Sequence, residues 1–145
     1  MLKSNLSAET QQYLELFYEP RISAYEFFKL FFAILYRRGV KEVTRDFTEF
    51  LYKEKKKDSF RDILREIKFK NNGIYYYSNQ IEDSIFNLQN VGLIGKENPS
   101  FGKILLKYNE LVVADILSNF ERNDIELVES IVNDMASQDE WGDMF

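Results

Sequence analysis

The residues best suited to a chemical role form a basic run between residues 53 and 70. Cationic side chains grouped in this way can neutralise the phosphates of a nucleic acid, with an affinity that falls as salt rises. Acidic residues stand at helical ion-pair spacings within the same run, so a solvated, internally paired face is the alternative. The residues that would contact nucleic acid are Lys55, Lys56, Lys57, Arg61 and Arg65.

Side chains suited to catalysis or to metal binding are sparse. The chain has no His and no Cys, which removes the commonest general base and the thiolate ligands. Carboxylates are frequent after residue 108, but their spacing matches no metal site, and no glycine-rich phosphate loop or nucleophile elbow occurs. The sequence therefore predicts a protein that is not an enzyme and that needs no cofactor or metal.

The last eight residues combine large apolar side chains with acids. Trp141, Met144 and Phe145 lie among Asp139, Glu140 and Asp143. Such a segment can dock into an apolar pocket of a partner that is rimmed by Lys and Arg. It can equally fold back onto the core of its own chain. Both possibilities stay open, and residues 138–145 are treated as a tail separate from a single domain at 1–137.

A second candidate for partner binding is a helix expected over residues 24–37. Ser23 and Glu26 have the spacing of a capping box, and Gly39 follows the end. The helix has no polar face, because apolar residues that include Phe28 and Phe32 point in every direction. It is either a central core helix or partly an interface with a second chain.

Apolar periodicity and turn residues predict the remaining elements. Asn72-Gly73 favours a type I′ hairpin, and Ser78 can cap a helix whose apolar stripe is Ile81, Ile85 and Leu88. The expected helices cover 8–18, 24–37, 44–55, 58–66, 79–91, 110–120 and 124–137, with hairpins at 67–77 and at 93–107, the latter turning through 97–100.

The run from Tyr77-Ser78 to Gly92-Leu93-Ile94, followed by a hairpin, resembles the last helix and the wing of winged-helix domains. A different winding is also possible, in which the helices at 44–55 and 58–66 and the 67–77 hairpin form the motif. The resemblance implies a mostly helical α+β fold. The implied fold has a winged-helix-like core, two short β-hairpins and helical N- and C-terminal extensions. The helix at 79–91 lacks Lys and Arg and carries Glu82 and Asp83, which suits protein contact better than DNA readout.

The whole arrangement loosely resembles the small middle subunits of bacterial three-component ABC-type ATPase defence systems, and winged-helix partners of SMC-like ATPases. That resemblance implies a non-catalytic adaptor between an ATPase and an effector, in a bacterial or phage setting. The alternative is a DNA-binding winged-helix regulator or antitoxin that uses the basic 53–70 segment.

Charge and hydropathy set the remaining expectations. The net charge of −5 hides a basic segment at 37–70 and an acidic one after it, which can attract each other or face different partners. The first residues lack the apolar core of a secretion signal, and no apolar run is long enough to span a bilayer. We therefore expect a cytoplasmic protein that does not enter a membrane.

Overall fold

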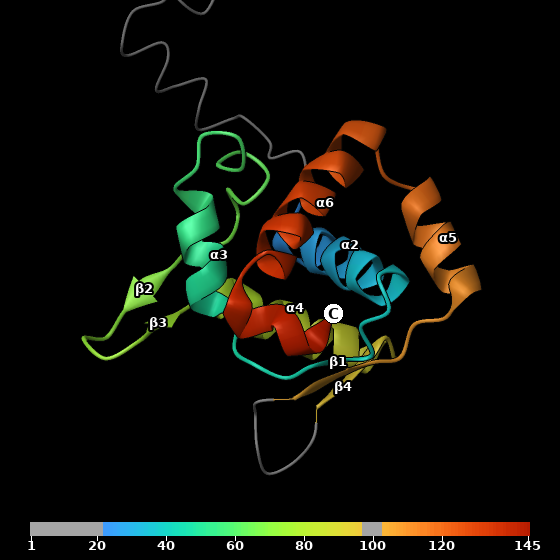
Figure 1. Cartoon of the computed structure of the whole chain (residues 1–145), viewed down its shortest axis with the longest axis horizontal. Helices are drawn as coiled ribbons and strands as arrows, with labels where there is room; N and C mark the ends of the chain where they lie inside the picture. Colours follow the sequence, from blue (N-terminus) through green and yellow to red (C-terminus); the bar gives the residue numbers. More distant parts are fainter. Residues whose placement is uncertain (1–21, 97–102) are drawn as a thin grey trace, which may run out of the picture.

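A computed structural model describes residues 22–96 and 103–145 (Figure 1). The fold is mostly helical α+β, as the sequence predicts. Its elements are α2 (Ala24–Arg37), β1 (Glu42–Val43), α3 (Thr48–Lys55), β2 (Lys70–Asn71), β3 (Tyr76–Tyr77), α4 (Asn79–Asn90), β4 (Ile94–Lys96), β5 (Ile104–Leu106), α5 (Glu110–Ser118), α6 (Arg122–Ala136) and a 3₁₀ helix η2 (Asp139–Met144). The helix expected at 8–18 and the turn expected at 97–100 lie outside the described residues.

Helix α2 is the centre of the molecule. The predicted capping box starts it, since Glu26 N donates to Ser23 Oγ at 3.1 Å and Ser23 N donates to Glu26 Oε1 at 3.4 Å. Helices α4, α5 and α6 pack around it (Figure 1). Phe28 and Phe32 are 0% exposed. These two residues therefore belong to the core and not to a partner-binding surface, which corrects their assignment as partner contacts.

The loop before α3 closes one side of this core with a ring. The Phe47 ring lies 5.8 Å from Phe28, 5.8 Å from Phe31 and 5.9 Å from Phe32, measured between centroids. Aromatic pairs at this separation add to the stabilisation from burial. Phe47 is 3% exposed and therefore belongs to the core.

A three-stranded antiparallel sheet has the order β1-β5-β4, with β5 in the middle. Val43 pairs with Ile104 on one side of β5, and Gly95 pairs with Leu105 on the other. The β4–β5 pairing is the hairpin predicted at 93–107. Strand β1 was not predicted, because two residues carry no local pattern and their pairing partner lies far along the chain.

The β2–β3 hairpin extends from the helical body beside α3 (Figure 1). The hairpin is confirmed, but the type I′ turn is wrong. That turn needs positive φ at both central residues. Gly73 meets this requirement with φ +94°. Asn72 does not, because every described residue with positive φ is a glycine. Asn72 instead supports a wider loop, since its Oδ1 accepts hydrogen bonds from the N–H groups of Ile74 and Tyr75 at 2.9 and 3.0 Å.

Residues 58–66 form successive turns, so the helix predicted there is wrong. Their backbone bonds are mostly of the i to i+3 type, such as Arg65 N to Asp62 O at 3.2 Å. The large apolar side chains in and next to this segment are nevertheless buried, namely Phe60, Ile63, Leu64 and Ile67. Burial of these side chains keeps the segment in place against the core. A segment as short as 58–66 cannot form a stable helix by itself. Helix α3 also starts later than predicted, because Asp46 accepts hydrogen bonds from the N–H and hydroxyl of Thr48.

Helix α6 ties the acidic end of the chain to its basic middle. Arg37 binds Glu129 at 3.0 Å, Arg38 donates to Asn133 Oδ1 at 2.7 Å, and Lys57 binds Asp134 at 2.9 Å. The attraction expected between the two oppositely charged segments therefore operates within the chain.

The C-terminal residues fold back onto the domain. Trp141 in η2 is 3% exposed, and its ring lies 6.1 Å from that of Phe50 on α3. Met144 is half-buried against the core, and the Phe145 ring lies 5.6 Å from the Arg38 guanidinium. Trp141 is therefore part of the core, which corrects its assignment to a docking tail and joins residues 139–144 to the domain.

Candidate binding surfaces

Helix α4 presents one face to the core and the other to solvent. Its predicted cap is confirmed, since Ile81 N donates to Ser78 Oγ at 3.4 Å. The predicted stripe of Ile81, Ile85 and Leu88 is buried, and the helix packs on α2. Gly92, with φ +80°, takes the left-handed conformation that follows many helix ends.

The outer face of α4 carries an exposed phenylalanine among acids. Phe86 is 62% exposed, and Glu82 and Asp83 on the preceding turn are also exposed. No Lys or Arg occurs in α4. A large apolar side chain next to carboxylates suits a partner that offers an apolar pocket beside basic residues.

Two adjoining hollows flank this face, and together we call them the α4 groove. Their volumes are about 490 and 190 Å³, and Glu82, Ile85 and Lys96 line both. Phe86 and Gln89 line the larger hollow. The smaller one reaches Phe47 and Thr48 at the start of α3. The groove therefore runs from the exposed face of α4 to the loop before α3.

The basic segment is divided by the fold. Lys55, Arg61 and Arg65 line one pocket of about 450 Å³, which we call the basic pocket, together with Asp58, Asp62 and Lys68. Lys56 and Lys57 are not among the residues that line it. Three of the five residues predicted to contact nucleic acid are therefore brought together, and Lys68 joins them.

Lys55 is a half-buried cation of the basic pocket. Its Nζ donates to the carbonyl oxygen of Ile67 at 2.6 Å. Burial, and then the neighbouring charge of Lys68, lower the pKa of Lys55. The pocket is thus a place where positive charge is crowded and partly removed from water.

Lys57 has a structural role instead. It contacts Glu54 Oε1 at 3.0 Å and Asp134 Oδ2 at 2.9 Å, so it links α3 to α6. The Glu54 side chain is 2% exposed, and burial, followed by the neighbouring Asp134, raises its pKa to about 7. Hydrogen bonds to Asp134 and Glu54 raise the pKa of Lys57.

A row of rings lies beside the basic pocket, and we call Phe69, Tyr52 and Tyr76 the aromatic row. Tyr52 stacks on Tyr76 with centroids 4.0 Å apart, and it meets Phe69 edge-on at 5.7 Å. Lys56 Nζ lies 4.4 Å from the Tyr52 centroid. Lys55 Nζ, which lines the pocket, lies 5.7 Å from the Phe69 centroid.

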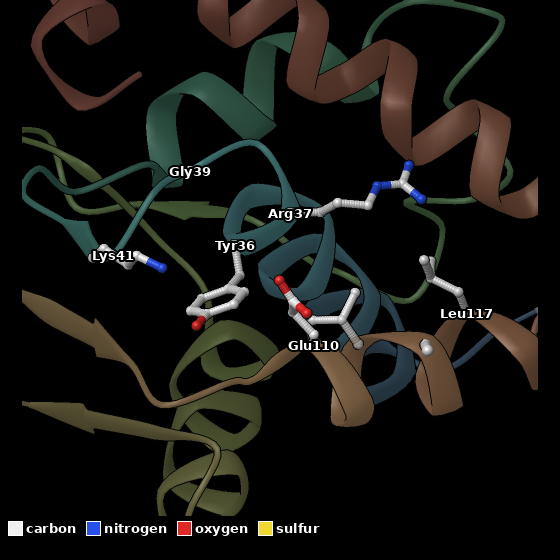
Figure 2. Close-up of a pocket in the computed structure, with 8 residues that line it drawn as sticks. Tyr36, Arg37, Gly39, Lys41, Glu110 and Leu117 are labelled. Carbon is white, nitrogen blue, oxygen red and sulfur yellow. The ribbon is translucent and has the colours of Figure 1, made fainter.

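A further hollow of about 510 Å³ lies between the end of α2 and α5 (Figure 2). Val113, Ala114 and Leu117 contribute apolar surface to it. Lys41 Nζ sits 4.0 Å from the Tyr36 ring centroid. Figure 2 shows the Arg37 side chain extending toward α6, where it binds Glu129. Two cations that line this hollow, Arg37 and Lys41, are thus already engaged with the protein.

The described residues contain neither a metal-binding cluster nor a membrane-spanning helix. Within residues 22–96 and 103–145, no three His, Cys, Asp or Glu side chains lie close enough to hold a metal ion. In the same part of the chain, no helix has the length and apolar character needed to cross a bilayer.

The chain matches no family model, no curated protein and no solved structure. The function therefore has to be argued from the surfaces themselves. Phe86 was not among the predicted site residues, although its position off the Ile81, Ile85 and Leu88 stripe was a signal that it faces outward. Lys68 lies within the basic run predicted at 53–70, whereas Lys96 joins the α4 groove from a separate strand, which no local pattern encodes.

Proposed function

We propose that this chain is a non-catalytic, cytoplasmic adaptor that binds a partner protein through the α4 groove. The observation that carries the proposal is the exposed Phe86 on a helix whose exposed charges are acidic. The complex would be a multi-protein assembly of the kind that bacterial or phage defence systems form. An ATPase or an effector subunit is the kind of partner that the resemblance suggests.

The order of the elements supports a winged-helix-like core for this adaptor. Along the chain, α2, β1, α3, α4, β4 and β5 follow one another, with the β2–β3 hairpin inserted between α3 and α4. The β4–β5 hairpin follows α4 along the chain, and β5 pairs with β1, which supports the interpretation of this hairpin as a wing. In such a core, α4 takes the position of the helix that other winged-helix proteins place in DNA.

Charge favours protein over duplex DNA at this position. Glu82 and Asp83 would face a phosphate-lined groove, where like charges repel. Base-edge readout commonly uses Arg or Lys, and α4 has neither. A basic protein surface with an apolar pocket is complementary to both the charge and the Phe86 ring.

The test is a pull-down from host lysate with tagged full-length variants, with and without nuclease. We expect the wild-type chain and Leu111→Asp to retain a stoichiometric protein after nuclease, and Phe86→Asp to lose it. Leu111 is a matched control, because it is an apolar side chain exposed on another helix, α5. Thermal melts would verify that both variants are folded.

Two results would overturn the proposal. Equal retention of the partner by Phe86→Asp and by wild type would remove the α4 groove from the interface. Loss of every partner on nuclease treatment would instead favour the DNA-binding regulator or antitoxin.

A further inference from the structure

We propose that the basic pocket and the adjoining β2–β3 hairpin form a binding site for single-stranded nucleic acid. Phosphates would bind at Lys55, Arg65 and Lys68, and an unpaired base would stack on Tyr75. This site shares no lining residue with the α4 groove, so it is a second function and does not depend on the adaptor proposal.

The charge of the pocket suits a phosphate. Four cationic side chains line it against two carboxylates, and one of these carboxylates, Asp58, already binds Arg61 at 2.7 Å. Lys55 is half-buried, and Lys68 contributes to lowering its pKa. An anion between them would relieve this repulsion, which is a favourable interaction that a neutral ligand cannot provide.

The aromatic side chains continue directly from the pocket. From Lys55 the contacts pass to Phe69, then to Tyr52 and then to Tyr76, with separations of 5.7, 5.7 and 4.0 Å. Tyr75, the next residue toward the hairpin tip, lies outside this row, since it is 58% exposed and its ring lies 6.4 Å from that of Tyr77. Stacking of bases on aromatic rings beside a basic groove is the usual means of binding a single strand without sequence preference.

The local backbone favours a single strand over a duplex. Residues 58–66 form turns, so this segment has no helix to insert into a major groove. A phosphopeptide could use the cations of the pocket, but it would gain little from Tyr75. The tyrosine therefore distinguishes the two kinds of ligand.

The experiment is fluorescence anisotropy of a labelled single-stranded oligonucleotide of mixed sequence, titrated with the full chain at several salt concentrations. We expect Lys68→Glu and Arg65→Glu each to weaken binding by about tenfold or more at low salt. The slope of log K against log salt should flatten by about 0.7 for each phosphate that the variant no longer neutralises. Lys53→Glu is the matched control, since Lys53 is an exposed lysine of α3 that does not line the pocket.

Three further variants test effects that a general decrease in positive charge would not explain. Tyr75→Ala should weaken binding about fivefold to a hundredfold, as removal of a ring that stacks on a base does. Leu111→Ala, which removes an exposed apolar side chain on α5, should leave it unchanged. Asp62→Asn should tighten binding, because it removes a carboxylate from the pocket.

Several outcomes would overturn the proposal. These are absence of oligonucleotide binding, equal weakening by Lys53→Glu and Lys68→Glu, and tighter binding of duplex than of single strand. A phosphopeptide that binds as tightly, with no effect of Tyr75→Ala, would assign the pocket to peptides.

Discussion

Helices α2 and α4 pack against each other, and each carries phenylalanine, yet the two use it differently. On α2, Phe28 and Phe32 are enclosed by other elements, whereas on α4 Phe86 points into solvent. The same side chain therefore contributes to stability in one helix and is available for binding in the other. Residue type alone would have assigned both to the same role. What separates them is how many neighbours cover each helix.

The sharpest test of this difference is a matched pair of truncations. We expect Phe32→Ala to lower the free energy of unfolding by about 3–5 kcal/mol, through reduced burial and the cavity that remains. Phe86→Ala should change it by less than about 0.5 kcal/mol, as exposed positions do. Urea unfolding followed by circular dichroism measures both. Equal effects would show that the two helices are not distinguished by burial.

The C-terminal segment offers a second comparison between a buried aromatic ring and an exposed one. Trp141→Ala should cost about 2–4 kcal/mol, because its ring is buried against Phe50. Phe145→Ala should cost less than about 1 kcal/mol, since that ring is partly exposed. The same unfolding measurement applies. If Trp141→Ala were as mild as Phe145→Ala, the tail would be detached in solution.

Local signals predicted much of this arrangement. The capping box at Ser23 and Glu26 defined the start of α2, and Ser78 with the Ile81, Ile85 and Leu88 stripe defined α4. These signals act over one or two helical turns, so the sequence states them directly. The absence of a polar face likewise indicated that α2 must be covered, although not by what.

The features that the sequence did not predict share one physical cause. Each of them depends on contacts with residues that are distant in the chain. Strand β1 exists because Val43 pairs with Ile104. In residues 58–66, apolar spacing reported correctly that Phe60 and Leu64 are buried, but it could not report that their backbone forms turns. Exposure of Phe86 and burial of Trp141 also depend on where other elements pack.

The next test concerns Glu54, a carboxyl group that is buried in the fold. Its pKa in the fold is about 7, above the ordinary value of 4.5, so the folded chain holds more protons than the unfolded chain between these values. The contribution of Glu54 to stability is therefore present at low pH and is lost as pH rises through this window. The loss is on the order of 1–3 kcal/mol.

Glu54→Gln removes this titration while keeping the shape of the side chain. We expect the stability of the variant to exceed that of wild type at pH 8 and to depend less on pH between about 5 and 8. Glu49→Gln on the same helix is the control, because that carboxylate is exposed. Urea unfolding across this pH range measures the effect. Parallel pH profiles for Glu54→Gln and wild type would contradict the assignment.

The smallest effect concerns the surface contacts that hold α6 over α2. Arg37→Ala should cost about 0.2–1 kcal/mol, since its bond to Glu129 is exposed and screened by salt. Arg122→Ala, which breaks a pair within α6, should cost no more than about 0.5 kcal/mol. Unfolding at low and high salt would separate the two contributions. A decrease of several kcal/mol for Arg37→Ala would mean that charge, rather than the apolar packing of α2, holds α6 in place.

The central position of α2 also has a consequence during synthesis of the chain on the ribosome. Its phenylalanines emerge early, but the last helix that covers them ends at Ala136, about a hundred residues after Arg37. At roughly 5–20 residues per second, translation leaves α2 without its full cover for about 5–20 seconds. During that interval this phenylalanine-rich helix is a natural substrate for chaperones and a starting point for aggregation.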